Sequence, residues 1–469
     1  MTKNHDLVVI GGGPAGYAAA LYAAAAGLDV ALIEENRLGG TCLHVGCIPA
    51  KELLETASVL RSVQKAEDFG ISTGGKTSID LSISQIRKQN VIDQLFAGLK
   101  ALLSNRQVTV YEGRGHLQKG LKVTIEKNDE EEIIEGKNVI LATGSSPRSI
   151  PGFEVDGKLV MTSDEFLGIE KIPKRVAVIG GGAIGCEFAS LLGDFGSSVT
   201  LLESLEEILP GCDKDVATVV KKSFIKKGIE IHTGALVSGH KPNTATTTIS
   251  WSKDEQEHEM EVDLIVVAVG RQPNVSADDL EETEVTVDDK GFIEVNERLQ
   301  TKESGVWAAG DVINTPQLAH IGFAEGMFIV KEILGESPVP IDPTTVPWCI
   351  YCDPEVAFAG LTESAAKDAG YQVVTSKHRY SGNGRAMILG ETEGLVKVIA
   401  EVEDQGAAGR ILGVHMTGPW VTEQLGQAYL AVNWEATVEE VSNHIQPHPT
   451  LSELFGEAVL SLTGRSLHG

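Results

Sequence analysis

Two long stretches of the chain share one pattern of apolar and polar positions. Residues 7–35 read LVVIGGGPAGYAAALYAAAAGLDVALIEE. The apolar run at 7–10 predicts a strand, the Ala-rich segment a helix, and the next apolar run a second strand. Residues 176–204, VAVIGGGAIGCEFASLLGDFGSSVTLLES, repeat this order 169 positions later. Two strand–turn–helix–strand units of this kind predict an α/β fold with Rossmann-like domains.

The rest of the first three quarters of the chain is mixed. Apolar positions at three- and four-residue spacing over 52–103 predict helix around a short GISTGGKTS break. Alternating segments predict strands in three further stretches: 108–141 with an acidic turn at 129–132, 244–269, and a short strand within 301–311.

A different pattern begins near residue 346. It predicts strands over 356–360, 396–400 and 411–416, and two helices, one of them over 421–433. This last quarter is therefore expected to form a separate α+β domain.

Each of the two repeated turns carries three glycines in the spacing GxGxxG. They are Gly11, Gly13 and Gly16 in the first turn and Gly180, Gly182 and Gly185 in the second. The first glycine of such a motif permits a tight turn, the second lets a pyrophosphate approach the backbone, and the third lets helix and strand pack closely. A single GxGxxG is also compatible with an ordinary βαβ turn. Two copies in the same context favour dinucleotide binding at helix N-termini.

An acidic residue follows each turn at the distance expected of a ribose ligand. Glu34 lies 21 residues after Gly13, and Glu203 lies 21 residues after Gly182. One chain is therefore expected to hold two dinucleotides. The segment between Val199 and Cys212 contains no Lys or Arg. A 2′-phosphate would meet only acidic side chains there, so the second site is expected to prefer NAD over NADP.

Composition narrows the class of protein. The chain has 469 residues, which predicts about three domains, and its 42% hydrophobic and 22% charged residues are ordinary for a globular protein. Lys plus Arg total 39 against 66 Asp plus Glu, giving a net charge of −27, so we expect no nucleic-acid partner. No apolar run is long enough to span a membrane, and no targeting segment is recognisable, which predicts a cytoplasmic protein without a membrane partner.

The six cysteines are too few for a disulfide scaffold, but two of them lie close together. Residues 39–51 read GGTCLHVGCIPAK, so Cys42 and Cys47 are five positions apart. A zinc site, an inert buried pair and a redox disulfide are the three interpretations. In a regular helix this spacing corresponds to about 7.5 Å along the axis, beyond the roughly 4.4–6.8 Å between α-carbons that a disulfide tolerates. A disulfide therefore requires a distorted helix start, which Gly46 makes feasible.

A second cysteine pair, Cys349 and Cys352, has the spacing CxxC. The pattern predicts a strand here, in which residues three apart face opposite sides and lie about 10 Å apart. No disulfide can bridge that distance. We expect no functional role for this pair.

Taken together, the motifs resemble those of the pyridine nucleotide–disulfide oxidoreductases. The resemblance covers essentially the whole chain and rests on the following segments in family order: GGGPAG, GGTCLHVGCIPAK, LATGSSP, GGGAIGCEF, VGRQPN, AAGD, LAH with Glu325-Gly326, and HPTLSE. It implies a tightly but non-covalently bound FAD, NAD as second cofactor, and a homodimer. The implied domains are an FAD domain over 1–148 and 275–345, an NAD domain over 149–274, and a dimer-interface domain over 346–469.

The resemblance also implies roles for individual residues. Cys47 would lie against the flavin and Cys42 would exchange with the substrate's sulfurs. Lys51, one helical turn after Cys47, would sit near the reactive nitrogen of the flavin and pair with Glu187. Further residues would line the FAD site, namely Gly11, Gly13, Gly16, Glu34, Gly40, Thr41, Gly115, Thr143, Gly144, Asp311 and Ala319. The NAD site would be lined by Gly180, Gly182, Ile184, Gly185, Glu203, Val237 and Gly270.

The segment QPHPTLSELF carries the remaining chemistry. Two prolines flank His448 and exclude a regular helix there, so a fixed loop is expected to place the imidazole. Glu453, five residues later near a helix start, can hydrogen-bond one ring nitrogen and raise the basicity of the ring. In the family this histidine acts as acid/base in the active site of the partner subunit. Many members carry a second histidine two residues earlier, where this chain has Gln446.

Within the family, the motifs are most similar to those of the branch that oxidises dihydrolipoamide with NAD⁺. The partners implied are a lipoylated E2 component of a 2-oxo acid dehydrogenase complex or a lipoylated H-protein. A glutathione- or mercuric-reductase-like enzyme is the alternative within the family. The acidic run after Val199 disfavours the NADP-preferring reductases, and the mercuric reductases need a further cysteine pair that this chain lacks. A non-catalytic subunit of a multienzyme assembly is the alternative from another class.

Overall fold

The computed structural model describes residues 3–75, 77–276, 280–403 and 406–468. The chain forms two compact units, each assembled from three segments. Unit 1 comprises Met1–Leu53, Asp80–Arg148 and Gly270–Pro343, and unit 2 comprises Leu54–Ile79, Ser149–Val269 and Thr344–Gly469. The three domains predicted from the sequence do not coincide with these two units, and the three-domain division stays a prediction.

Unit 1 is built on one mixed sheet with the strand order β3-β2-β1-β6-β5-β4, in which β17 also pairs with β6. Strands β1, β2, β3, β17 and the second half of β6 run parallel, while β4, β5 and the first half of β6 form an antiparallel meander. The bounds are β1 Lys3–Ile10, β2 Val30–Glu34, β3 Thr109–Glu112, β4 Arg114–Gln118, β5 Lys122–Lys127, β6 Glu130–Leu141 and β17 Val306–Ala308. A short pair, β7 Ser145–Pro147 with β16 Arg271–Pro273, completes the unit.

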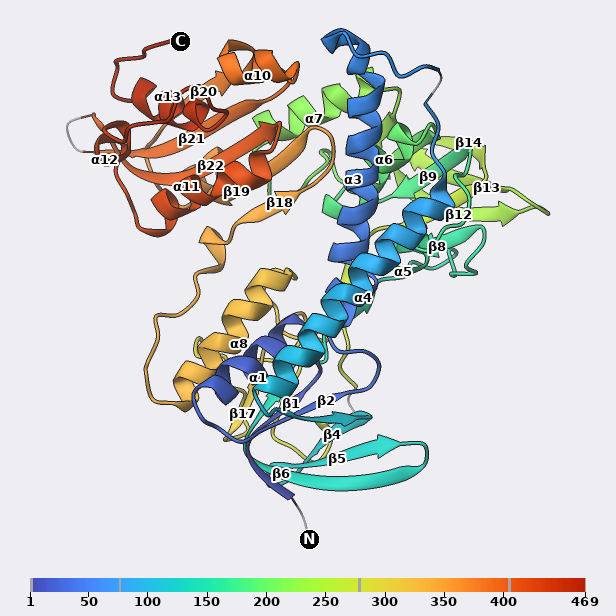
Figure 1. The fold of residues 1–469 in the computed structure, drawn as a ribbon, viewed down its shortest axis with the longest axis vertical. Helices are drawn as coiled ribbons and strands as arrows, with labels where there is room; N and C mark the ends of the chain where they lie inside the picture. The colour runs from blue at the N-terminus through green and yellow to red at the C-terminus, as the bar shows by residue number, and fades with distance from the viewer. Residues whose placement is uncertain (1–2, 76, 277–279, 404–405, 469) are drawn as a thin grey trace. The chain divides into compact units, whose positions relative to one another are not determined.

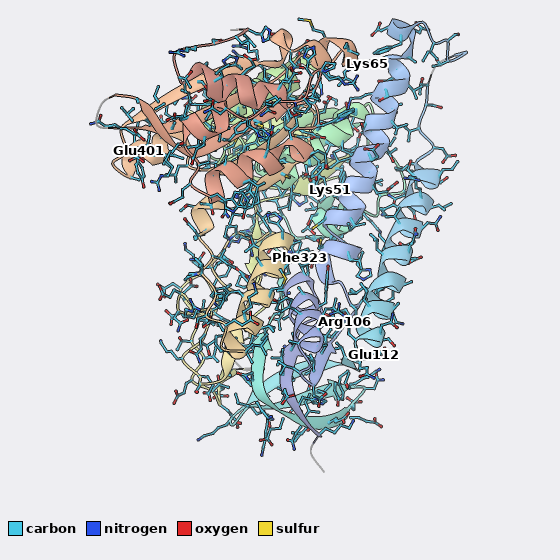
Figure 2. All side chains as sticks on the ribbon, turned by 60° about the vertical axis from the view of Figure 1, so that its left-hand side comes forward. Lys51, Lys65, Arg106, Glu112, Phe323 and Glu401 are labelled. Carbon is cyan, nitrogen blue, oxygen red and sulfur yellow. The ribbon has the colours of Figure 1, made fainter. Side chains whose placement is uncertain are left out.

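Helices α1 (Pro14–Ala25) and α8 (Ala319–Ile333) lie side by side in unit 1 (Figure 1). Their backbones can approach closely because Gly326 has no side chain. A β-carbon at this position would lie 2.4 Å from the Ala15 carbonyl oxygen. Tyr17 on α1 and Phe323 on α8 add a ring contact with centroids 5.5 Å apart (Figure 2 labels Phe323). The remaining helices that begin in this unit are α2 Gly40–His44, α3 Cys47–Gln64 and α4 Leu81–Asn105.

Unit 2 contains a parallel five-stranded sheet of order β11-β10-β9-β15-β8 and an antiparallel meander β12-β13-β14. The bounds are β8 Val160–Thr162, β9 Arg175–Ile179, β10 Ser198–Glu203, β11 Glu230–Thr233, β12 Leu236–Pro242, β13 Thr247–Lys253, β14 Gln256–Val262 and β15 Leu264–Val267. The helices of this part are α5 Ser163–Phe166, α6 Ala183–Asp194 and α7 Lys214–Lys226.

The last quarter of the chain, also in unit 2, forms an antiparallel sheet of order β18-β19-β22-β21-β20. The strands are β18 Trp348–Ile350, β19 Glu355–Gly360, β20 Val373–Arg379, β21 Leu395–Val402 and β22 Ala408–Gly418. The helices are α9 Glu363–Asp368, α10 Gly384–Leu389, α11 Val421–Asn433, α12 Val438–Ser442 and α13 Glu453–Ser461. Short 3-10 turns occur at Ala66–Phe69, Pro343–Thr345 and Tyr380–Gly382.

The α/β class and both strand–turn–helix–strand units are confirmed, and so is the helix over 421–433. Three details differ. The turn expected at 129–132 lies at 128–129, where both residues have positive φ, so Asp129 belongs to the turn and residues 130–132 belong to β6. Strand β12 was not predicted, because its sequence LVSGHKP has few apolar positions. The C-terminal region holds more short helices and strands than the pattern indicated.

The strand expected to carry both members of the CxxC pair is shorter than predicted. It ends at Ile350, so Cys349 lies on β18 and Cys352 beyond it. The Cys349 thiol donates to the Thr422 carbonyl oxygen at 3.8 Å, and the buried Cys352 thiol donates to the Pro354 carbonyl oxygen at 3.3 Å. The two sulfurs thus have separate partners.

None of the helices in the described part of the chain is long and apolar enough to cross a bilayer.

Candidate functional site

The two glycine turns have the same local geometry. The first glycine of each has positive φ, +106° at Gly11 and +103° at Gly180, a region that favours glycine. A β-carbon on Gly16 or Gly185 would lie 1.8 Å from the carbonyl oxygen of that first glycine. No other side chain can replace these residues without moving the helix away from the strand.

The middle glycine of each turn faces open space. A β-carbon built on Gly13 or Gly182 would have no neighbour within 4 Å. Each therefore leaves room in front of a helix N-terminus, where backbone N–H groups and the helix dipole favour an anion. Both turns fit the pyrophosphate of a dinucleotide in the manner predicted from the three glycine positions.

The two acidic residues hold the turns themselves, a role that the sequence did not indicate. Glu34 accepts hydrogen bonds from the Gly12 amide at 2.7 Å and the Asn36 amide at 2.8 Å. Glu203 accepts from the Gly181 amide at 2.5 Å and the Leu205 amide at 2.7 Å. Each carboxylate keeps further acceptor capacity for a ribose hydroxyl, because its two oxygens offer about four lone-pair sites.

The loop after Glu203 is acidic in space as well as in sequence. Glu206 is exposed and Glu207 is half-buried. Lys214, which lies beyond the stretch predicted to lack cations, approaches Glu207 at 3.9 Å. That lysine is already opposed by a carboxylate, so the local charge stays unfavourable for a 2′-phosphate.

The cysteine pair spans a break between two helices. Cys42 lies on α2, which ends at His44, and Cys47 is the first residue of α3. Val45 between them has φ −140° and ψ 22°, so the predicted distortion of the helix start is confirmed. A β-carbon on Gly46 would lie 2.9 Å from the Thr41 carbonyl oxygen, which shows why a glycine stands at the break.

The two sulfurs lie close enough to interact. Both are present as thiols in this structure, and the Cys42 thiol hydrogen-bonds with Cys47. This hydrogen bond and burial raise the pKa of Cys42 far above its usual value, while nearby Lys51 opposes the rise. Lys51 lies on α3 one turn after Cys47, as predicted (Figure 2).

Tyr17, which was not predicted, stands next to the cysteine pair. Burial, together with the charges that Cys42 and Cys47 can carry, raises the pKa of this tyrosine to about 12. It lies on α1, immediately after the first glycine turn. The apolar pattern of this Ala-rich helix does not indicate that Tyr17 lies near the cysteines.

The histidine inside the cysteine motif has another use than metal binding. His44 Nε2 donates to the Leu38 carbonyl oxygen at 2.8 Å, and its ring packs on Phe96 with centroids 5.3 Å apart. Among the described residues no group of three or more His, Cys, Asp or Glu is arranged to hold a metal ion.

The residues predicted to line the FAD site follow strand ends of the unit 1 sheet. Gly11 follows β1, Glu34 ends β2, Thr143 and Gly144 follow β6, and Asp311 follows β17. Ligands of open α/β sheets bind outside the carboxyl ends of parallel strands. The others lie on neighbouring elements, with Gly115 on β4, Gly40 and Thr41 opening α2, and Ala319 opening α8. The unit therefore brings the predicted positions to one edge of the sheet.

Asp311 is held by residues to which the sequence assigned no role. Its carboxylate accepts a hydrogen bond from the Ser145 hydroxyl at 2.5 Å and lies 3.8 Å from Arg271 Nε. Arg271 also donates to the Ser145 hydroxyl at 2.7 Å and to its carbonyl at 2.6 Å. These partners belong to the segments LATGSSP and VGRQPN, so the motifs themselves were the available signal.

Glu325 buttresses the same loop from α8. It accepts hydrogen bonds from the Gly310 amide at 2.6 Å and from the Thr315 hydroxyl at 2.7 Å. Burial raises the pKa of Glu325 to about 7, and the nearby carboxylate of Asp311 adds to the rise. The sequence indicated Glu325 only as part of a family motif and gave it no role of its own.

In unit 2, Ile184 and Gly185 lie in the first turn of α6, and Val237 lies on β12. Gly270 has φ +106° and begins the third segment of unit 1. Glu187 is buried on α6 and accepts from the Tyr351 amide at 2.9 Å. Its predicted pairing with Lys51 would join the two units and stays a prediction.

His448 and Glu453 meet as predicted. His448 Nδ1 lies 2.8 Å from Glu453 Oε1, and Glu453 Oε2 accepts from the Thr450 amide at 2.6 Å. The histidine lies outside any helix and 78% of its side chain is exposed. A carboxylate on Nδ1 selects the tautomer with its proton on that nitrogen, which leaves Nε2 as the basic, accessible atom.

The fold and these sites define a protein with two glycine turns of the dinucleotide-binding type and a cysteine pair in the same unit as the first. Family models agree with this description. The model of the pyridine nucleotide-disulphide oxidoreductases matches residues 5–326, and that of their dimerisation domain matches residues 346–459. The chain belongs to the pyridine nucleotide-disulphide oxidoreductase family.

Individual relatives are similar over their whole length. A dihydrolipoyl dehydrogenase of Bacillus subtilis is 43% identical over 100% of both chains, and one of Haloferax volcanii is 36% identical over 99% of this chain and 97% of its own. Among solved structures, LpdA from Mycobacterium tuberculosis superposes with a TM-score of 0.90 at 26% identity, over 98% of this chain and 100% of that one. The flavoprotein disulfide reductase RclA of Escherichia coli, solved as a Cu(II) complex, gives 0.86 at 26% identity over the same shares.

Proposed function

We propose that this chain is an NAD-dependent dihydrolipoamide dehydrogenase that acts as a homodimer. Its substrate would be the dihydrolipoyl group of an E2 component of a 2-oxo acid dehydrogenase complex or of an H-protein, in the cytoplasm. The observation that carries the proposal is the cysteine pair across the α2–α3 break, with Lys51 one turn later and a dinucleotide turn in the same unit. The names and full-length similarity of the relatives support the choice of substrate.

The cofactors follow from the two turns. FAD is assigned to the first turn, with an FAD domain over 1–148 and 275–345, and NAD to the second, with an NAD domain over 149–274. The interface domain would cover 346–469. When bound, the flavin supplies two-electron transfer between a dithiol and nicotinamide. Gly13 and Gly182 leave the room, while Glu34 and Glu203 hold the turns and keep acceptor capacity for ribose.

The chain's own part in the reaction is thiol–disulfide exchange. In the oxidised enzyme Cys42 and Cys47 form a disulfide, and a dihydrolipoyl thiolate attacks the Cys42 sulfur, so that Cys47 leaves as a thiolate. The second dihydrolipoyl thiolate then attacks its own mixed-disulfide sulfur, which closes the lipoyl disulfide and releases Cys42. Two electrons and one proton leave for NAD⁺ as the equivalent of a hydride, and the other proton goes to solvent.

His448 would accept the proton of the attacking thiol. Its Nδ1 is occupied by Glu453, so Nε2 is the atom that takes and returns the proton. Because the His448 ring is exposed, it is free to act on the active site of a second subunit. An isolated monomer would then lack this proton acceptor and be inactive. Lys51 opposes the rise in the pKa of Cys42, so its charge favours the thiolate form of this thiol.

The test is a steady-state assay of the purified holoenzyme. We expect NAD⁺ reduction by free dihydrolipoamide, far slower reduction of NADP⁺, and no oxidation of NADH or NADPH by glutathione disulfide. Turnover of glutathione disulfide, or a preference for NADP⁺, would replace the proposal by a glutathione-reductase-like activity. A protein without flavin absorbance would point to a non-catalytic subunit.

A further inference from the structure

A cavity of about 510 Å³ lies within unit 2, between helix α7 and the edge of the C-terminal sheet. Its walls come from α7 on one side and from strand β20 and the loop before β21 on the other. None of its lining residues belongs to the glycine turns, the cysteine pair or the His448–Glu453 pair. It is therefore separate from every site described above.

Four cationic side chains converge on this cavity. Lys222 and Lys226 are four residues apart on α7, so they share one helix face. Lys377 and Arg379 are two residues apart on β20, so they share one face of the strand. The chain has a net charge of −27, but the lining of this cavity holds four cations against two carboxylates, Asp215 and Glu393.

Two of the four cations brace the walls. Lys226 pairs with Glu393, whose carboxylate also accepts from the Ser223 hydroxyl at 3.0 Å. Lys377 Nζ lies 2.7 Å from Asp215 Oδ2. These pairs tie the helix to the sheet edge and use both carboxylates of the lining.

The other two cations have no such partner. Within the described part of the chain, neither Lys222 nor Arg379 forms an ion pair or a side-chain hydrogen bond, and both are exposed. Their charges face the same cavity from opposite walls. The hydroxyl-bearing residues Thr218, Ser381 and Thr392 line the same cavity. An anion between the walls would therefore find two uncompensated positive charges and several hydrogen-bond donors.

We propose that this cavity binds a small phosphorylated anion, with Lys222 and Arg379 as its two charged contacts. The volume suits a small molecule, and the lining contains no aromatic side chain on which a nucleobase could stack. The ligand class is thus a compact phosphate ester or polyphosphate rather than a nucleotide. Such a ligand bridges α7 and β20 and stabilises the contact between them.

The test uses pyrophosphate as the probe and isothermal titration calorimetry of the holoenzyme at low ionic strength. The titration is carried out with saturating NAD⁺, so that the second glycine turn is occupied. We expect one binding event per chain, a rise in melting temperature with pyrophosphate, and weakening by added salt. AMP is the second probe, and tighter binding of AMP than of pyrophosphate would overturn the assignment of the ligand class.

The variant Lys222→Gln/Arg379→Gln removes both unpaired cations. We expect its dissociation constant for pyrophosphate to rise about tenfold or more, because two charge-assisted contacts are lost. The matched control is Lys221→Gln/Arg465→Gln, which removes the same charges at positions outside the cavity. The control should bind as the wild type does, and both variants should oxidise dihydrolipoamide at the wild-type rate.

Two outcomes would overturn the proposal. One is the absence of pyrophosphate binding to the NAD⁺-saturated wild type. The other is equal binding by the cavity variant and the control, which would show that the anion sits elsewhere. Neither outcome bears on the oxidoreductase activity, because that activity is measured separately.

Discussion

The two glycine turns are nearly the same structure, yet only one stands beside a redox centre. In each, the amide of a loop residue donates to the carbonyl of the second residue of the turn at 2.8 Å, from Gly39 to Gly12 and from Leu209 to Gly181. After this shared contact the chains diverge. The first loop continues into α2, which carries Cys42, whereas the second continues through Pro210-Gly211 to α7.

The divergence shows how one nucleotide-binding plan serves two purposes. The backbone of the glycine turn is retained, because the glycines and the acid hold it locally. The chemistry differs because the first loop inserts a broken helix against the turn. A β-carbon on Gly40 would lie only 2.8 Å from the Gly13 α-carbon, so the loop with the cysteines packs directly on the first glycine turn.

The largest effect should come from disrupting the cysteine pair, which only the first glycine turn has beside it. In Cys47→Ser, we expect dihydrolipoamide oxidation to fall roughly a thousandfold or more, because the disulfide cannot form. NAD⁺ affinity, measured by fluorescence titration, should not change, since the second turn is intact. Cys349→Ser is the matched control and should keep full activity. Full activity of Cys47→Ser would remove the redox role of the pair.

The two turns can next be broken one at a time. A methyl group at Gly16 or Gly185 would lie 1.8 Å from a backbone oxygen, a conflict that costs about 1–3 kcal/mol or more. Gly16→Ala should lower the flavin content of the purified protein, and Gly185→Ala should raise the Kd for NAD⁺ about tenfold. Absorbance and fluorescence titration measure the two quantities.

Control substitutions for this pair are available on other helices. A methyl group at Gly98 on α4 or at Gly426 on α11 would have no neighbour within 4 Å, so Gly98→Ala and Gly426→Ala should change neither quantity. If Gly16→Ala weakened NAD⁺ binding while leaving flavin content unchanged, the assignment of the two cofactors would have to be reversed.

A smaller effect should follow from the charge of the loops. The first loop carries Arg37, whereas the second carries Glu206 and Glu207. Glu206→Arg should lower the ratio of kcat/KM for NAD⁺ to that for NADP⁺ about tenfold, because a cation replaces a repelling carboxylate near the 2′-position. Glu206 is exposed and does not hold Gly181, so stability should not change. If the ratio did not change, the preference for NAD⁺ over NADP⁺ would not depend on Glu206.

The smallest effect concerns pH and a histidine buried behind the second loop. His415 Nδ1 accepts from the Asp213 amide at 3.2 Å, and burial lowers the pKa of His415 to about 4. A histidine with a depressed pKa in the folded state stabilises the fold above its ordinary pKa near 6.5. This stability is lost progressively as pH falls from about 6.5 to 4.

Thermal unfolding as a function of pH measures this effect. The variant His415→Gln removes the titrating group, so the slope of stability between pH 6.5 and 4 should become shallower than in the wild type. Glu325, near the first turn, has a pKa raised to about 7, so its contribution runs in the opposite direction and is lost as pH rises towards 7. If stability fell equally steeply with pH in the wild type and in His415→Gln, the loss of stability could not be attributed to protonation of His415.

Much of the geometry of both glycine turns was predictable because the determinants are local. Positive φ at Gly11 and the close approach at Gly16 exclude other residues, so the pattern itself carries the geometry. The break between Cys42 and Cys47 was predictable for the same reason, since no regular helix brings sulfurs five residues apart together. The meeting of His448 and Glu453 also needed only a short loop and a helix start.

Other parts of the sites depend on residues far apart in the chain. Ser145, Arg271 and Asp311 come from three segments and are joined only by the fold. Lys397 is buried with its Nζ 2.9 Å from Asp213 and 2.7 Å from Glu363, a cluster that no local pattern indicates. The cavity between α7 and β20 is of the same kind.

The amino-acid sequence by itself determined the turns, the acids that follow them and the helix break, because backbone sterics act between neighbouring residues. The tertiary structure decided which distant side chains support Asp311, where Glu325 and His415 are buried, and where cations without carboxylate partners face each other. Electrostatics and burial depend on proximity in space, which the linear order of residues does not state.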